Sequence, residues 1–234
     1  MKKIGLVGGV GPASTIEYYS SLVKRCLADS KQTYYPEIVI DSVNMAAHDA
    51  AFEVGDYERL CNYLLESLND LKAAGAKIAA ITANTEHIVW DMICDRFPLP
   101  VVSIVDAAVA RVKALGYGRA LVFGTTFTMR SGLYEKALGK QGIVPIIPSE
   151  SDIEIIGKCI YPNLENGIVI PEDRNTLIEI AEQYIKREKA DVLMLACTEL
   201  PLAISPGDVS IPTLNTTEIH IEEIYRQAAE EICT

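Results

Sequence analysis

The chain has 234 residues, 49% of them hydrophobic, and a formal net charge of −11 at pH 7. It is long enough to bury a core without metal or disulfide staples, and its apolar content excludes a disordered protein. Because the negative charge is spread along the chain, nucleic acid and anionic membrane surfaces are not expected as partners, and a small molecule is the better expectation.

The opening MKKIGLVGGVGP predicts a strand followed by a glycine-rich turn. Glycines interrupt its apolar run, and neither a cleavage pattern nor a span of about 20 apolar residues follows. We therefore expect no membrane segment and a cytoplasmic protein. The six cysteines form no C-x-x-C pair and no histidine or carboxylate cluster has ligand spacing, so free thiols and no metal site are expected.

Short apolar runs alternate along the chain with segments of helical period. Uninterrupted apolar strands separated by helices predict an α/β protein with parallel sheets covered on both faces. Two helices have a clear buried stripe, one over residues 56–75 that ends at Gly75 and one over residues 174–190. The expected strands cover residues 3–8, 37–43, 77–82, 99–104, 119–124, 143–147, 191–196 and 211–215.

The two halves of the sequence look like copies of one another. Ala83 in ITANTEH and Cys197 in LACTEL hold matching positions 114 residues apart, and Gly8 and Gly124 end strands 116 residues apart. An internal duplication predicts two similar αβα lobes related by a pseudo-twofold axis, residues 1–99 plus 213–234 and residues 100–212. Since ligands bind beyond the carboxyl ends of parallel strands, we expect the strand ends to line one cleft between the lobes.

The turn GLVGGVGPAST opens the first helix, with Pro12 in its first turn. Such a turn can present backbone N–H groups to an anion, and Gly11 and Ser14 are candidate binding residues. A dinucleotide site is the rival interpretation, weakly supported by Asp41, but the third glycine of that fingerprint is replaced by Ser14. A tight turn without a ligand is the simplest alternative.

Three further polar motifs follow predicted strands: TANTEH, GTTFT and ACTEL. Hydroxyl and amide side chains there could bind a carboxylate, or could serve only as helix caps. Cys197 lies at a strand end close to a predicted helix start, where thiolate is favoured, although burial is the usual fate of a cysteine. The candidate binding residues in these motifs are Asn84, Thr85, Thr125, Thr126 and Thr198.

GGVGPAST, ANTEH, GTTFTM and ACTEL, in this order and over the whole chain, resemble the aspartate/glutamate racemase family. The resemblance implies two lobes, a homodimer, an amino-acid or dicarboxylate ligand, and racemisation without pyridoxal phosphate or any other cofactor. In that family two cysteines flank the substrate α-carbon, one removing a proton and the other returning one. Cys197 matches one of them, and Glu199 is a candidate for orienting or tuning it.

The position of the second cysteine is taken by Ala83, which cannot transfer a proton. Three interpretations stay open. Another group, such as Thr82, Thr85, Glu86, His48 or an ordered water, serves that face of a racemase; the chain resembles the single-cysteine decarboxylases of the superfamily; or it is a binding protein, an inactive relative or a substituted variant. An acidic substrate would need a cationic side chain to bind its second carboxylate. In the loop after the second strand His48 is the only candidate, and the corresponding region of the second half has the acidic Glu165 in place of a cation.

Overall fold

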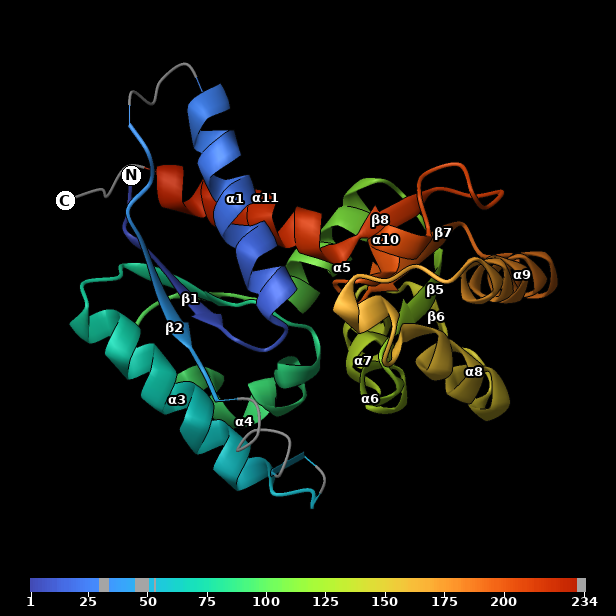
Figure 1. Cartoon of the computed structure of the whole chain (residues 1–234), viewed down its shortest axis with the longest axis horizontal. Helices are drawn as coiled ribbons and strands as arrows, with labels where there is room; N and C mark the ends of the chain where they lie inside the picture. The colour runs from blue at the N-terminus through green and yellow to red at the C-terminus, as the bar shows by residue number, and fades with distance from the viewer. Residues whose placement is uncertain (30–33, 45–50, 53, 231–234) are drawn as a thin grey trace. The chain divides into compact units, whose positions relative to one another are not determined.

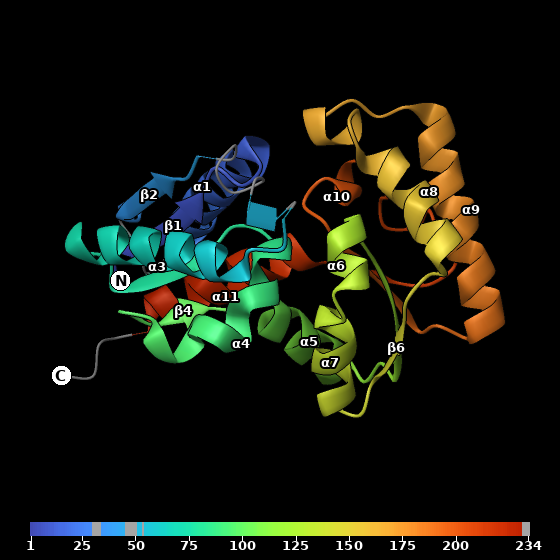
Figure 2. The ribbon, with the colours of Figure 1, turned by 90° about the horizontal axis from the view of Figure 1, so that it is seen from below.

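A computed structural model describes residues 1–29, 34–44, 51–52 and 54–230. The backbone forms two compact units, Met1–Ile104 with His220–Thr234, and Val105–Ile219. The sequence-based boundaries at 99/100 and 212/213 fall a few residues before these. Figures 1 and 2 show the ribbon of the two units from two directions. No helix in the described part of the chain is long and apolar enough to cross a membrane.

The first unit is built on a parallel sheet of four strands in the order β2-β1-β3-β4. In its register Leu6 lies opposite Ile40 on one side and Ala80 on the other. The strands are β1 (Ile4–Gly8), β2 (Ile38–Ser42), β3 (Ile78–Ile81) and β4 (Val101–Val102). The helices are α1 (Pro12–Ala28), α3 (Tyr57–Ala73), η1 (Thr85–Val89), α4 (Trp90–Ile93), η2 (Cys94–Arg96) and α11 (Thr216–Ala229), which begins in the second unit.

The two faces of this sheet bury alternate residues of its strands, as the period of two in a β-strand requires. On one face Val7 and Ile81 pack against the leucine stripe of α3, including Leu64 and Leu68. On the other face Leu6 and its neighbours pack against α1 and α11 (Figures 1 and 2). Both faces are therefore covered by helices, which confirms the predicted layering for this unit.

The second unit repeats the plan, with a parallel sheet in the order β6-β5-β7-β8. Its strands are β5 (Arg119–Gly124), β6 (Val144–Ile146), β7 (Val192–Ala196) and β8 (Thr213–Asn215). Helices α8 and α9 cover the face that buries Phe123 and Leu195. The helices are α5 (Ile104–Ala114), α6 (Thr126–Arg130), α7 (Leu133–Lys140), α8 (Glu150–Ile160), η3 (Leu164–Asn166), α9 (Pro171–Glu188) and α10 (Leu200–Ala203).

The identical strand order of the two sheets confirms the α/β fold and the duplication inferred from sequence. All eight expected strands are present within a residue or two of their expected ends. In each unit the two central strands are neighbours and parallel, so their carboxyl ends lie at one edge of the sheet. The glycine turn and ANTEH therefore share an edge in the first unit, and GTTFT and ACTEL share one in the second.

Candidate active site

Cys197 follows the last residue of β7 and lies in a small polar cluster in the second unit. Its thiol donates a hydrogen bond to the Glu199 carboxylate, with Sγ and Oε2 3.1 Å apart. The Thr198 hydroxyl donates to the same oxygen at 2.6 Å. Cys197 is 4% exposed and Glu199 9% exposed, so the pair is largely removed from water. One carboxylate oxygen thus accepts from both a thiol and a hydroxyl.

The thiol of Cys197 is held in its neutral form. Burial is the largest cause and the negative charge of Glu199 the next, and together they raise the pKa well above its ordinary value of 9.0. Backbone N–H groups of Glu199 and Leu200 act in the opposite direction but are outweighed. The expectation that this strand end favours thiolate is therefore wrong for the chain without substrate, because desolvation and a neighbouring carboxylate prevail.

The three threonines of GTTFT have different roles. Thr125 is the N-cap of α6, accepting from the Thr128 N–H at 3.1 Å and donating to the Thr128 hydroxyl at 3.0 Å. Thr126 makes no hydrogen bond through its hydroxyl to any residue in the described part of the chain, and it is half-buried. Of the two carboxylate-binding candidates here, Thr126 is the one whose hydroxyl is not used by the fold.

In the first unit the TANTEH segment is held by hydrogen bonds of two side chains, Thr82, which sequence reasoning treated as a possible proton carrier, and His87. Thr82 is fully buried, and its hydroxyl donates to the carbonyl of Val7 at 3.0 Å. His87 lies with Nδ1 3.0 Å from the Ala83 carbonyl oxygen, and its Nε2 accepts the Ile104 N–H at 3.4 Å. These partners require a neutral ring with its proton on Nδ1.

Burial of His87 lowers its pKa to about 3, which agrees with a neutral ring. The ring is 1% exposed and stacks on Trp90, with centroids 5.0 Å apart and planes 11° apart. His87 is therefore a structural histidine that fixes the backbone of Ala83. Ala83 itself is 8% exposed and Asn84 is 4% exposed, whereas Thr85 is half-buried.

The glycine-rich turn folds back on itself. The Gly9 N–H donates to the Thr15 hydroxyl at 3.0 Å, and that hydroxyl donates to the Gly11 carbonyl at 3.4 Å. Gly9 has φ +84°, and a Cβ on it would lie 2.7 Å from the Val43 carbonyl, so glycine is required here. The Ser14 hydroxyl donates to the Thr82 carbonyl at 2.8 Å, joining α1 to the end of β3.

Sequence reasoning noted the Thr15 hydroxyl beside the glycine turn but did not assign it the role of partner for the turn's N–H groups. It also did not single out Gly157. Glycine is unfavourable inside a helix, so its presence within α8 indicates a local requirement for a missing side chain. His48 lies outside the described residues. Within the described residues no group of three or more His, Cys, Asp or Glu side chains is arranged to hold a metal ion.

Two α/β units with the same strand order, each carrying polar loops at the carboxyl ends of its two central strands, define an internally duplicated α/β protein. The model of the Asp/Glu/Hydantoin racemase family matches residues 7–224. The chain therefore belongs to the Asp/Glu/Hydantoin racemase family.

Individual relatives agree with this assignment. The broad specificity amino-acid racemase RacX of Bacillus subtilis strain 168 is 23% identical over 221 residues, which cover 92% of each chain. An aspartate racemase homologue from Pyrococcus horikoshii OT3 is 32% identical, with a TM-score of 0.86 over 98% of this chain and 100% of that one. The Picrophilus torridus aspartate racemase, 24% identical, shares the fold with a TM-score of 0.78 over 98% and 96% of the two chains.

Proposed function

We propose that this chain moves the α-proton of a small amino acid at Cys197, in the manner of the cofactor-independent amino-acid racemases that it resembles. The observation that carries the proposal is the buried hydrogen bond from the Cys197 thiol to the Glu199 carboxylate, at 3.1 Å. A neutral thiol beside a proton acceptor can be converted to thiolate at the moment when the substrate has displaced water.

The proton balance of this step is simple. The thiol proton passes to Glu199, and the resulting thiolate of Cys197 takes the α-proton. A substrate ammonium group near Glu199 would favour this state, because a positive charge lowers the pKa of the thiol. The charge left on the α-carbon spreads into the substrate carboxylate, which hydroxyl donors such as Thr126 stabilise. Thr198, Asn84, Thr85 and the Gly11 turn are the remaining candidates for binding the substrate.

Return of the proton from Cys197 restores the original enantiomer, whereas inversion requires a donor on the opposite face. Ala83 carries none, Thr82 is engaged with Val7, and the Nδ1 proton of His87 is engaged with the Ala83 carbonyl. We infer that α-proton exchange with retention is faster than inversion. The groups left to complete a racemisation are Thr85, Glu86, His48 or an ordered water. We further expect the protein to act as a homodimer in the cytoplasm.

The test follows the loss of the α-proton in deuterated water by NMR, for both enantiomers of aspartate, glutamate, alanine and serine. We expect exchange with at least one of them, and a loss of about 100-fold or more in Cys197→Ser. Cys94→Ser is the matched control, because Cys94 is a half-buried thiol in η2 that belongs to none of the four motifs of the site. Undiminished exchange in Cys197→Ser would disprove the role of this thiol.

A second candidate function is favoured by the same alanine. A single thiol can protonate a planar enolate from one side, as the single-cysteine decarboxylases of the superfamily do. Release of carbon dioxide from a 2-substituted malonate, lost in Cys197→Ser and accompanied by no exchange of amino-acid α-protons, would replace the first proposal by this one. Tight binding of a dicarboxylate with neither reaction would instead indicate a binding protein.

A further inference from the structure

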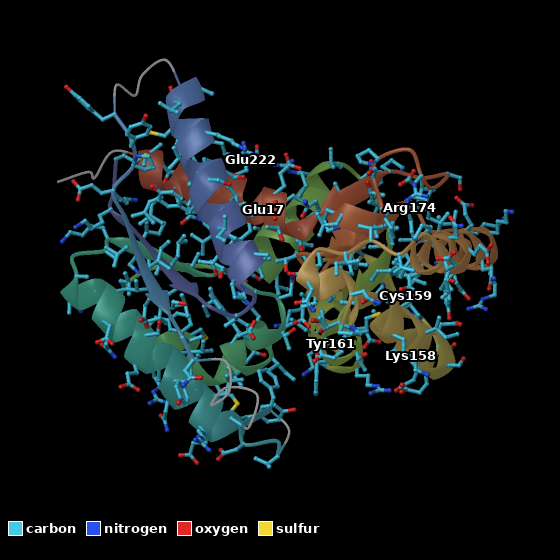
Figure 3. The ribbon with its side chains drawn as sticks, in the orientation of Figure 1. Glu17, Lys158, Cys159, Tyr161, Arg174 and Glu222 are labelled. Atoms are coloured by element: carbon cyan, nitrogen blue, oxygen red, sulfur yellow. The ribbon has the colours of Figure 1, made fainter. Side chains whose placement is uncertain are left out.

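Gly157 lies in the interior of α8, where glycine is unfavourable by about 1 kcal/mol relative to alanine. The backbone does not require it, since Gly157 is not among the glycines with positive φ. The helix around it is regular, with Ile153, Ile156 and Cys159 on its buried face. Figure 3 labels Lys158, Cys159 and Tyr161, which follow Gly157 where α8 ends. A contact outside the helix must therefore account for the glycine.

That contact is the hydroxyl of Thr126. A Cβ on Gly157 would lie 2.4 Å from Thr126 Oγ1 and 3.8 Å from Thr126 Cβ, and beyond its chain neighbours and the backbone of its own helix it would meet no other heavy atom within 4 Å. The conflict is thus with one oxygen at the end of a side chain that can rotate. Alanine at position 157 would be accommodated by turning the Thr126 hydroxyl to another staggered position, which would remove it from its present direction.

We propose that Gly157 is a positioning residue, whose missing side chain sets the rotamer of Thr126 and so directs its hydroxyl toward the carboxylate of the substrate. The inference rests on the proposed function for the identity of that ligand. Hydrogen bonding does not hold the hydroxyl, because Thr125 and Thr128 bond to each other and Thr126 has no such partner in the described part of the chain. The space beside Gly157 is what permits the present direction.

The test compares Gly157→Ala with Gly139→Ala. Gly139 is also helical, in α7 of the same unit, and a Cβ on it meets nothing within 4 Å. Both variants remove a helical glycine, so both are expected to melt at the same temperature as the unmodified protein or above it. Only Gly157→Ala should change the three-bond couplings of the Thr126 γ-methyl carbon, which report its χ1 angle. The methyl signal is assigned by its loss in Thr126→Ala.

In the exchange reaction Gly157→Ala should raise KM about tenfold, the effect of losing a hydrogen bond to a charged group, and should also lower kcat, because the same hydroxyl stabilises the charge that develops on the carboxylate. Combined with Thr126→Ala, it should have no further effect on KM, because the hydroxyl it displaces is already absent. Gly139→Ala should leave both constants unchanged. A purely structural role for Gly157 would not produce this pattern.

Unchanged methyl couplings in Gly157→Ala would overturn the inference, and so would a rise in KM that persists in the Thr126→Ala background. The two proposals fail separately. If the unmodified protein exchanges no α-proton, the proposed function is wrong, whereas the couplings, measured without any substrate, still decide whether Gly157 sets the Thr126 rotamer.

Discussion

The thiol of Cys197 donates a hydrogen bond to the carboxylate of Glu199, two residues further along the loop that follows β7, with Sγ and Oε2 3.1 Å apart. The contact places a weak acid beside a proton acceptor in a buried setting, and burial first and the charge of Glu199 second raise the pKa of the thiol. On the proposed function, the same geometry keeps Cys197 protonated until a bound substrate makes it a base.

Replacing Glu199 by glutamine should lower the pKa of Cys197, because the charge that opposes thiolate is removed while burial remains. The measurement is the thiolate absorbance near 240 nm as a function of pH, corrected with Cys197→Ser. The exchange rate of Glu199→Gln should also fall, since its proton acceptor is lost. A thiolate that forms at higher pH in this variant would show that Glu199 does not oppose ionisation.

Thr125 and Thr126 should give opposite results when each is replaced by alanine. Thr125→Ala removes an N-cap and should lower the free energy of unfolding by about 1 kcal/mol. Thr126→Ala should change that free energy by less than about 0.5 kcal/mol, because its hydroxyl has no structural partner among the described residues, but it should raise KM about tenfold. Urea unfolding and exchange kinetics on the two variants separate capping from binding. Equal loss of stability in both would contradict the distinction.

Two buried histidines should make the first unit sensitive to acid. His87 has its pKa lowered to about 3 and His220 to about 4, mainly by burial. His220 is fixed between the Tyr18 hydroxyl at 2.8 Å and the Val102 carbonyl at 3.0 Å. Since both pKa values are depressed relative to the unfolded value near 6.5, the stability they contribute is complete above that pH and is lost as the pH falls toward 4 and 3.

At pH 5 the expected loss is about 2 kcal/mol for each histidine, relative to pH 7.5. Urea unfolding can be followed through Trp90, the only tryptophan of the chain, which stacks on His87. His220→Asn should reduce the slope of stability against pH by about 1 kcal/mol per pH unit between pH 4.5 and 6. An unchanged slope would mean that His220 is not the group that resists protonation.

Ala83→Cys should increase the rate of inversion about 100-fold or more, because it supplies an acid on the face that lacks one. Ala83→Ser is the matched control, with a side chain of similar size whose hydroxyl is far less acidic. Circular dichroism of the amino-acid product measures inversion directly. If Ala83→Cys raised inversion no more than Ala83→Ser, this position would not be the one from which the second proton is delivered.

Much of the fold could be predicted from the sequence, because buried parallel strands consist of uninterrupted apolar residues and the sequence motifs of the first half recur in the second. Helical spacing predicted one buried stripe in each of α3 and α9. The stripe residues are all buried in the structure: Leu60, Leu64, Leu68 and Leu71 in α3, and Leu177, Ile180, Ala181, Tyr184 and Ile185 in α9. The motif residues of the site could also be found, since they follow strands. Their assignment to roles could not.

Those roles depend on contacts between segments distant in the chain. Thr82 bonds to Val7 across 75 positions, and Ser14 bonds to Thr82 across 68. The pKa of Cys197 depends on its burial, which the sequence does not give, so the effect of the helix start was overestimated. The role proposed for Gly157 depends on the close approach of Thr126 to it. A pattern of residue types does not show which two distant segments come this close.

We propose that Cys197 moves the α-proton from one face of the substrate, and that Ala83, at the position of the family's second cysteine, supplies no ionisable side chain for the other. The most direct test incubates each pure enantiomer of the best substrate with the protein in deuterated water. Deuterium incorporation and optical inversion are then measured in the same sample. Deuterium should enter one enantiomer with retention at least about tenfold faster than inversion occurs, and Cys197→Ser should abolish both. Inversion as fast as exchange from both enantiomers would show that a second proton carrier serves the face assigned to Ala83, and the proposal would be wrong.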